Sequence, residues 1–319
     1  MRILREPEIL ARGDTPVAAA IGVFDGLHVG HQEVIRRMLG EAAARGGSSL
    51  VVTFDRHPNA VVAPDRVPPS ICSVPRRMKR LSAACVDACW QIRFDAAFSK
   101  IDAESFVTTL ARRFGKLTTL CIGGGFTFGF RRRGNIDLLR SLGAQLGFDA
   151  LAVETAVRDG LPVSSTRIRD HIRLGELAEA ASCLGRAYSF AGVVVDGRRL
   201  ARTLGFPTAN LDTAGLVLPP NGVYAAWVQI EHEPALRPAV MNIGMRPTVN
   251  GDSQPTPVVE VHIPGWNGDL YGCELEVFPV RRLRDEKRFS SLDALREQIS
   301  SDLRAATEAI IASTPPPAA

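Results

Sequence analysis

The chain has 319 residues, enough for two domains that each bury a hydrophobic core. Its apolar and charged fractions are ordinary for a globular protein, and a formal net charge of +4 is too small to indicate a nucleic-acid partner. The six cysteines are scattered, and no second pair or histidine cluster accompanies Cys85 and Cys89, which argues against a metal site and for reduced thiols. The N-terminus is too short and too charged for a signal peptide, and no apolar run is long enough to span a membrane. We therefore expect a cytoplasmic protein without a membrane partner.

Strand-like and helix-like segments alternate from Val17 to about Gly185. The patterns predict strands at 17–23, 49–54, 89–94, 116–123 and 150–154, and helices at 29–45, 76–84, 103–114 and about 136–146. Asp102 is a good N-cap for the third of these helices, and the proline-rich stretch 62–75 is predicted to be a loop. Such alternation is typical of an α/β, doubly wound parallel sheet, whose ligands lie beyond the carboxyl ends of the strands.

The first of those strand ends carries a motif, AIGVFDGLHVGHQ at 20–32. His28 and His31 stand three residues apart where the next helix begins, so they lie on one face. A helix N-terminus offers free backbone N–H groups and a positive dipole end to a phosphate, and two imidazoles there could stabilise charge during phosphoryl transfer. The alternative is a helix start that carries two ordinary histidines.

Three further segments of this half could contribute to the same site. TFDRHP at 53–58 brings a third histidine, His57, but taken alone it is an ordinary strand-end loop. GGGFTFGFRRRGN at 123–135 combines flexible glycines, arginines for phosphate, and alternating Phe126, Phe128 and Phe130, two of which could face a flat ligand. SSTRIR at 164–169 starts a helix with three hydroxyls. The alternatives are a glycine-rich turn with a solvated basic run, and an ordinary N-cap.

The pattern changes near Tyr188 to short strand-like runs at 187–195, 222–230, 238–244, 258–263 and 273–280, with Gly, Pro and Asn turns between them. No helix is predicted until Ser291, which indicates a small antiparallel barrel or sandwich. A final amphipathic helix follows, with Leu292, Leu295, Ile299 and Leu303 as its apolar stripe. We place one domain at 1–185, a second at 186–311, and a disordered tail at 312–319.

Two features of this second half suggest chemistry. The loop GRRLARTLGFPTAN at 197–210 ends with Thr208 and Asn210, whose hydroxyl and carboxamide are plausible oxygen ligands for Mg²⁺ bound to nucleotide phosphates. Glu260 lies in the strand-like VVEVH with Val259 and Val261 facing the other side, and it could accept a proton from a hydroxyl nucleophile. The alternatives are a polar hairpin loop and a solvent-facing glutamate on an edge strand.

The order of the motifs resembles that of bacterial bifunctional riboflavin kinase/FMN adenylyltransferases, also called FAD synthetases. GVFDGLHVGHQ, TFD-x-HP, GFTFGFRRRG, SSTRIR, LGFPTAN, NGVY, NIGMRPTVNG, VEVH and GDLYG follow one another as in that family, from about Val17 to Leu303. The resemblance implies a Rossmann-like nucleotidyltransferase domain followed by a six-stranded barrel with riboflavin kinase activity. It also implies riboflavin, FMN and ATP as substrates, Mg²⁺ as cofactor with ATP, and FMN and FAD as products.

The resemblance assigns roles residue by residue. In the first domain, His28 and His31 would act on the ATP phosphates, and the ATP site would also include Gly22, Phe24, Asp25, Gly30, Ser164, Ser165, Thr166 and Arg169. The flavin would contact Phe54, Phe126, Phe128 and Arg132. In the second domain, Gly205, Thr208 and Asn210 would bind ATP, with Thr208 and Asn210 holding Mg²⁺, and Glu260 would be the base for the ribityl 5′-hydroxyl.

The chain departs from the family pattern at Gly125, where Asp or Asn is usual, at Arg56 in place of Pro, at Ala201 in place of Gly, and at IPGWN, which replaces an aspartate-containing segment. Two alternatives to the bifunctional enzyme therefore stay open. One is a riboflavin kinase with a degenerate N-terminal scaffold, and the other is a non-catalytic flavin- or nucleotide-binding regulator. The intact set of His28, His31, Thr208, Asn210 and Glu260 argues against the regulator.

Overall fold

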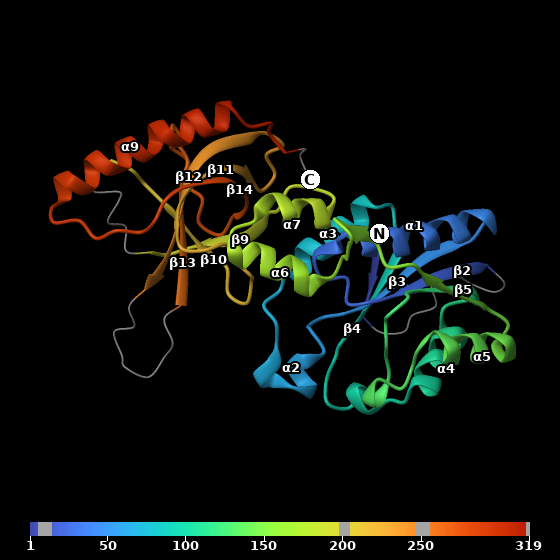
Figure 1. The fold of residues 1–319 in the computed structure, drawn as a ribbon. Coiled ribbons are helices and arrows are strands. Elements are labelled where there is room, and N and C mark those ends of the chain that lie inside the picture. The colour runs from blue at the N-terminus through green and yellow to red at the C-terminus, as the bar shows by residue number, and fades with distance from the viewer. Residues whose placement is uncertain (6–14, 198–204, 247–255, 317–319) are drawn as a thin grey trace. The chain divides into compact units, whose positions relative to one another are not determined.

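The computed structural model describes residues 1–5, 15–197, 205–246 and 256–316. Contacts divide the chain into two compact units, Met1–Ser70 with Val74–Ser165, and Ile71–Ser73 with Thr166–Ala319 (Figure 1). The domain boundary predicted at 185/186 is a prediction about which parts of the chain fold independently. The division by contacts does not test it, so it stays a prediction. Among the described residues, no helix is long and apolar enough to cross a membrane.

The first unit is built on a six-stranded sheet of order β1-β4-β3-β2-β5-β6 in which all neighbours are parallel. The strands are β1 (Arg2–Leu4), β2 (Pro16–Ile21), β3 (Ser48–Phe54), β4 (Ala88–Ile92), β5 (Lys116–Gly123) and β6 (Asp149–Val153), and a small hairpin pairs β7 (Val157–Arg158) with β8 (Leu161–Pro162). The helices are α1 (Val29–Ala44), α2 (Asn59–Val62), α3 (Val74–Ala83), α4 (Ala103–Arg113) and α5 (Ile136–Leu146), and the 3₁₀ turns are η1 (Asp25–Leu27), η2 (Pro64–Arg66), η3 (Phe98–Lys100) and η4 (Phe130–Arg132).

Helices cover both faces of this sheet, which confirms the predicted doubly wound fold. One core joins alternate strand residues such as Ala19 and Val52 to Phe106 of α4 and Leu139 of α5. The opposite core packs the other face against α1 and α3, and Figure 1 shows α1 on one side of the sheet with α4 and α5 on the other. Asp102 caps α4 as predicted, since its side chain accepts a hydrogen bond of 2.7 Å from the Ser105 N–H.

The second unit contains α6 (Ser165–Leu174), of which Ser165 itself is counted with the first unit, and α7 (Leu177–Leu184). A closed antiparallel barrel of order β10-β13-β12-β11-β14-β9 follows, as the resemblance implied. Its strands are β9 (Phe190–Val195), β10 (Ala209–Asp212), β11 (Gly222–Ile230), β12 (Leu236–Arg246), β13 (Thr256–His262) and β14 (Glu274–Arg284). Helix α9 (Leu292–Ile311) begins after Ser291, whose hydroxyl accepts a hydrogen bond from the Ala294 N–H, and it packs on Ala225 and Trp227 of the barrel.

Three local predictions need correction. Strand β1 was not predicted, because it has three residues in a charged segment and gains its partner, β4, from far along the chain. Strand β10 overlaps the end of the stretch predicted as a loop; it was missed because it is short and two of its four residues, Asn210 and Asp212, are polar or charged. The α9 stripe is partly wrong: Leu292 is 57% exposed, and the face against the barrel carries Ala306, Ala309 and Ile310 instead. Residues 317–319 of the predicted tail, and Ala201, lie outside the described residues.

Candidate active sites

The two histidines meet at the turn between β2 and α1. His28 is the N-cap of α1, and its Nδ1 accepts a hydrogen bond of 3.3 Å from the His31 N–H. The two rings stack with their centroids 3.6 Å apart and an interplanar angle of 18°. A Cβ at Gly30 would lie 3.3 Å from the His28 ring, and one at Gly22 would lie 3.0 Å from the Phe24 ring, so both glycines allow close ring packing. The helix start therefore lies where the sequence predicts it, and anion binding there stays a prediction.

The electrostatics of this turn favour a neutral His31 imidazole. Burial, with His28 and Arg77 nearby, lowers the pKa of His31 well below its usual value. The His31 Nδ1 is buried and accepts no hydrogen bond from any described residue. Because the His28 Nδ1 is an acceptor, a neutral His28 ring carries its proton on Nε2. Both rings can thus present N–H donors without adding positive charge.

A buried arginine supports this turn and was missed by the sequence analysis. Arg77 of α3 is 5% exposed, and its guanidinium donates hydrogen bonds to the carbonyls of Val23 (2.6 Å) and Phe54. Those carbonyls lie just beyond β2 and at the end of β3, so Arg77 joins two carboxyl strand ends at the edge where a ligand is expected. In the sequence Arg77 looks like part of a basic helix surface, since its acceptors are more than 20 residues away.

The SSTRIR segment reaches this turn through Ser165. Its hydroxyl donates a hydrogen bond of 3.2 Å to the carbonyl of Asp25, a residue that is itself buried. Thr166 and Arg169 lie further along α6 in the second unit, with Arg169 buried, and Ser164 directly precedes the helix. Their part in ATP binding stays a prediction.

The predicted flavin contacts differ in accessibility. Phe54 and Phe128 are buried in the core, while Phe126 is half-buried and stacks on Phe128 with ring centroids 6.2 Å apart. Arg132 is exposed, and its Nε donates to the Thr127 hydroxyl at 2.9 Å. Phe126 and Arg132 are therefore the members of the set that a flavin could reach without core rearrangement.

The two departures in this unit lie on the surface. A Cβ added at Gly125 would meet no atom within 4 Å, so the loop has room for a side chain there. Arg56 forms an exposed ion pair of 3.0 Å with Asp55. Partial burial raises the pKa of the Asp55 carboxyl, but the hydrogen bonds from Arg56 and the Phe94 N–H outweigh it and hold that pKa below its usual value. His57 accepts a hydrogen bond from the Asn59 N–H, as in an ordinary strand-end loop.

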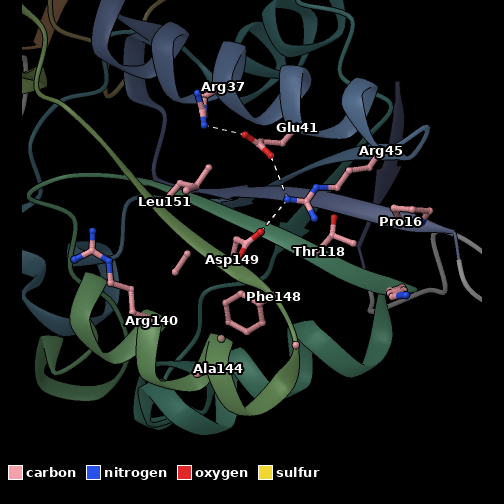
Figure 2. A pocket seen from close by; sticks show the side chains of 14 residues that line it. Pro16, Arg37, Glu41, Arg45, Thr118, Arg140, Ala144, Phe148, Asp149 and Leu151 are labelled. Carbon is pink, nitrogen blue, oxygen red and sulfur yellow. Dashed lines mark hydrogen bonds and ion pairs between the residues drawn. The ribbon is translucent and has the colours of Figure 1, made fainter.

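A cavity of about 1020 Å³ lies at the opposite, amino edge of the same sheet, beside Pro16, Lys116 and Asp149. Figure 2 shows Arg45 between Glu41 and Asp149, with nitrogen–oxygen distances of 3.5 and 2.8 Å, and Arg37 on Glu41 at 3.0 Å. The negative dipole ends of α1 and α5 point to this region, which disfavours a phosphate. Its arginines are therefore better explained as structural ion pairs than as a nucleotide site.

The predicted kinase residues come together on the outer face of the barrel. Glu260 of β13 pairs in register with Asn210 of β10 on one side and Asn242 of β12 on the other. Val259 and Val261 point into the barrel with at most 1% exposure, so the predicted alternation is confirmed. Because β13 has partners on both sides, the alternative of a glutamate on an edge strand is wrong. Asn242 was missed, although an asparagine between the inward-facing Met241 and Ile243 could have marked it.

Asn210 has the surroundings of a ligand-binding amide. It is 7% exposed, and its Oδ1 is buried without a hydrogen-bond donor in the described part of the chain. A Cβ at Gly197 would collide with the same amide, so that glycine lets the backbone of the preceding loop approach closely. A buried amide oxygen of this kind suits a hard cation such as Mg²⁺. Gly205 and Thr208 precede it, with Gly205 exposed in the left-handed region at φ 89°.

Two cavities meet at Thr208. One, of about 280 Å³, is lined by Glu260 and Asn242 and by apolar side chains of α9 and the segment before it, namely Phe289, Leu295, Ile299 and Leu303. The other, of about 530 Å³, lies on the side of Trp266 and Tyr271. Three of the leucine and isoleucine residues of the predicted α9 stripe thus face a cavity rather than the protein core.

A buried ion pair holds α9 beside the first cavity. The Asp302 carboxylate accepts hydrogen bonds from Arg284 of β14, at 2.9 Å from Nε and 2.7 Å from Nη2, and from Gln298 at 2.8 Å. The side chains of Asp302 and Arg284 are 7% and 21% exposed. The described ranges hold no group of three His, Cys, Asp or Glu side chains that could bind a metal on its own.

Comparisons with known proteins match both halves of the chain. A family model for FAD synthetase matches residues 11–167, and one for riboflavin kinase matches residues 184–310. The chain is 36% identical over 288 residues to the bifunctional riboflavin kinase/FMN adenylyltransferase of Escherichia coli (strain K12), covering 90% of this chain and 91% of that protein. It is 32% identical over 289 residues to the Haemophilus influenzae protein of the same name, covering 91% and 92%.

A solved structure of similar fold covers almost the whole chain. It is described as a macrolide-efflux protein from Streptococcus pneumoniae, is 27% identical with a TM-score of 0.80, and the match covers 96% of this chain and 99% of that one. With both halves matched by family models and relatives matched over nine-tenths of their length, the chain belongs to the bifunctional riboflavin kinase/FMN adenylyltransferase family.

Proposed function

We propose that the barrel site phosphorylates riboflavin through Glu260, Thr208 and Asn210, and that the His28–His31 turn adenylylates the resulting FMN. The two-step route to FAD predicted from the sequence is confirmed by the two family models and the full-length relatives. The roles of individual residues are our proposal. The main observation in support of the kinase roles is that Glu260 and Asn210 pair in register on one face of the barrel.

In the kinase step, Glu260 would accept the proton of the ribityl 5′-hydroxyl while the oxygen of that hydroxyl attacks the γ-phosphorus of ATP. The new O–P bond forms while the bond from the γ-phosphorus to the bridging oxygen breaks, so ADP leaves with that electron pair. Thr208 and Asn210 would hold Mg²⁺, which neutralises phosphate charge when bound. The buried Oδ1 of Asn210 supports this assignment, since it has no hydrogen-bond donor among the described residues.

The two cavities suggest where each substrate binds. The cavity beside Glu260 has apolar walls from α9, which suit the isoalloxazine ring of riboflavin. The cavity beside Trp266 would then take the nucleotide. Thr208 lines both, so it stands where a phosphate would pass from one substrate to the other.

In the adenylyl step, an FMN phosphate oxygen would attack the α-phosphorus of a second ATP, and pyrophosphate would leave without a covalent enzyme intermediate. Neutral His28 and His31 would donate N–H hydrogen bonds to the phosphates, beside the backbone N–H groups that open α1. Ser164 and Ser165 would add contacts to the same phosphates, and Thr166 and Arg169 would bind ATP as the resemblance implies. Phe126 and Arg132 would contact the flavin, supported from the core by Phe54 and Phe128.

The surroundings in which the protein works are also part of the proposal. We place it in the cytoplasm, where riboflavin, FMN and ATP are its partners and nucleic acid is not. The modest net charge and scattered cysteines support this placement.

The kinase assignment is tested by Glu260→Gln, which keeps the shape of the side chain and removes the base. With riboflavin and Mg²⁺-ATP, chromatography of the flavins should show FMN formation slowed by about two to four orders of magnitude. Riboflavin binding should change little, and FMN supplied directly should still become FAD. Near-wild-type FMN formation would refute the role of Glu260.

The reciprocal variant, His28→Ala, should form FMN normally and lose FAD formation. Wild-type protein that forms FMN and no FAD would support the alternative in which the first domain is a scaffold.

A further inference from the structure

His262 contacts the loop that presents Thr208 and has no role in the mechanism above. It is the last residue of β13, two positions after Glu260, so the two side chains share the outer face of the strand. Its Nδ1 lies 2.7 Å from the carbonyl oxygen of Pro207. Its ring also meets the Phe206 ring edge-on, with centroids 5.8 Å apart. His262 thus touches the two residues directly before Thr208.

The hydrogen bond fixes which ring nitrogen carries the proton. A carbonyl oxygen can only accept, so the His262 Nδ1 must be the donor. A neutral His262 ring therefore has its proton on Nδ1 and an acceptor at Nε2. His28 has the opposite tautomer, because its Nδ1 accepts.

Thr208 depends on such a contact because it lies outside the strand ladder. Strand β10 begins at Ala209, which pairs with Val261, and Pro207 has no N–H to donate. The peptide between Pro207 and Thr208 is planar and trans, so holding its carbonyl also sets the direction of the Thr208 N–H and Cα. The His262 bond thereby ties Thr208 to the strand that carries Glu260.

We propose that His262 is a positioning residue for riboflavin phosphorylation, which holds the Pro207 carbonyl through its Nδ1–H and so places Thr208 for Mg²⁺-ATP. The proposal rests on the function proposed above for Thr208. It differs from a role in proton transfer, because a base would need the Nε2 acceptor and not the Nδ1 donor.

Two amide substitutions separate these roles. The side-chain nitrogen of Asn can occupy the place of the histidine Nδ1, whereas that of Gln matches Nε2. His262→Asn should keep the bond to Pro207 and stay within about threefold of the wild-type KM for ATP, measured from total FMN and FAD formed. His262→Gln should raise that KM about tenfold, equivalent to about 1.4 kcal/mol, with kcat changed much less.

A second readout does not depend on activity. Nitrogen-15 spectra of the imidazoles should show a protonated Nδ1 for His262 and also for His171, whose Nδ1 lies 2.6 Å from the Glu176 carboxylate. Only the His262 signal should disappear in both His262 variants. A signal from His262 with its proton on Nε2 would overturn the proposal. Wild-type KM in His262→Gln would also overturn it, as would an equal loss of kcat in both variants, which would indicate direct participation of the ring.

Thr208→Ala distinguishes failure of this inference from failure of the function on which it rests. If Thr208→Ala keeps the wild-type KM for ATP and the wild-type dependence on Mg²⁺, the function proposed for Thr208 is wrong. If Thr208→Ala weakens ATP use while His262→Gln does not, only the positioning role of His262 is wrong.

Discussion

Asp302 allows a quantitative test of how α9 is held beside the flavin cavity. Its carboxylate accepts hydrogen bonds from the Nε and Nη2 of Arg284 and one from Gln298, and its side chain is 7% exposed. Asp302→Ala would leave the Arg284 guanidinium largely buried without its counter-charge. Removing one partner of a buried ion pair costs about 3–5 kcal/mol. Since Arg284 is 21% exposed and water can reach it in part, we expect the lower end, about 3 kcal/mol.

Unfolding in urea, followed by the fluorescence of Trp227, measures this loss. Trp227 packs against α9, and its Nε1 donates to the Ser313 hydroxyl at 3.2 Å, so it reports on the unit that contains the change. The chain has three tryptophans, and replacing Trp90 and Trp266 by Phe leaves Trp227 as the sole emitter. Riboflavin affinity should fall as well, because Leu295, Ile299 and Leu303 of α9 line the flavin cavity.

Two further variants serve as controls for the loss of stability in Asp302→Ala. Glu297→Ala changes an exposed acid on the same helix and should stay within about 0.5 kcal/mol of wild type. Replacing the pair together, Arg284→Met with Asp302→Leu, should restore most of the stability, because no buried charge is left alone. A loss below about 1 kcal/mol in Asp302→Ala, or a double variant as unstable as the single one, would refute the reasoning.

Three other predictions concern Gly125, His31 and the proposed Mg²⁺ site. Gly125→Asn should raise the rate of FAD formation from FMN by up to about tenfold. The loop has room for a side chain there, and one added hydrogen bond contributes about 0.5–1.5 kcal/mol. An unchanged rate in both Gly125→Asn and Gly125→Asp would contradict this prediction. The free energy of unfolding should fall as the pH drops below about 6.5. In the unfolded chain His31 then takes up a proton, whereas its lowered pKa keeps it neutral in the folded protein. The slope approaches 1.4 kcal/mol per pH unit and should be smaller in His31→Gln, as thermal unfolding from pH 5 to 7.5 can show. Mg²⁺ alone should leave the melting temperature unchanged, and Mg²⁺-ATP should raise it. Stabilisation by the metal alone would contradict the proposal that the neutral side chains of Thr208 and Asn210 are its protein ligands.

Sequence patterns located most strands and helices because burial repeats at fixed intervals along each element. The same argument failed for α9, where Leu295 and Ile299 have the spacing of core residues and yet line a cavity. An apolar side chain that contacts a ligand and one that contacts the protein look alike in the sequence. The smaller Ala306 and Ala309 form the contact with the barrel, since they let the helix approach the strands closely.

Polar side chains were predicted where a motif marked them and missed where only the fold gives them a partner. Arg77 donates to one carbonyl just beyond β2 and to another at the end of β3, and Asp302 accepts from an arginine at the end of β14. Nothing near either residue in the chain indicates those partners. The alternation around Asn242 could have marked it as outward-facing, but only the register shows that its neighbour is Glu260.

The proposed metal ligands of the kinase site have a consequence for the order of events. Thr208 and Asn210 are neutral, and the carboxylate in register with Asn210, that of Glu260, is proposed to accept the hydroxyl proton. Magnesium sites in proteins normally take one or two carboxylates together with substrate phosphates. Because the two proposed ligands carry no charge, most of the attraction for the ion must come from the ATP phosphates, so metal and nucleotide enter together. With neutral protein ligands, the positive charge of the ion acts mainly on the phosphates. Glu260 does not bind the ion in this arrangement and can accept the hydroxyl proton once riboflavin is bound.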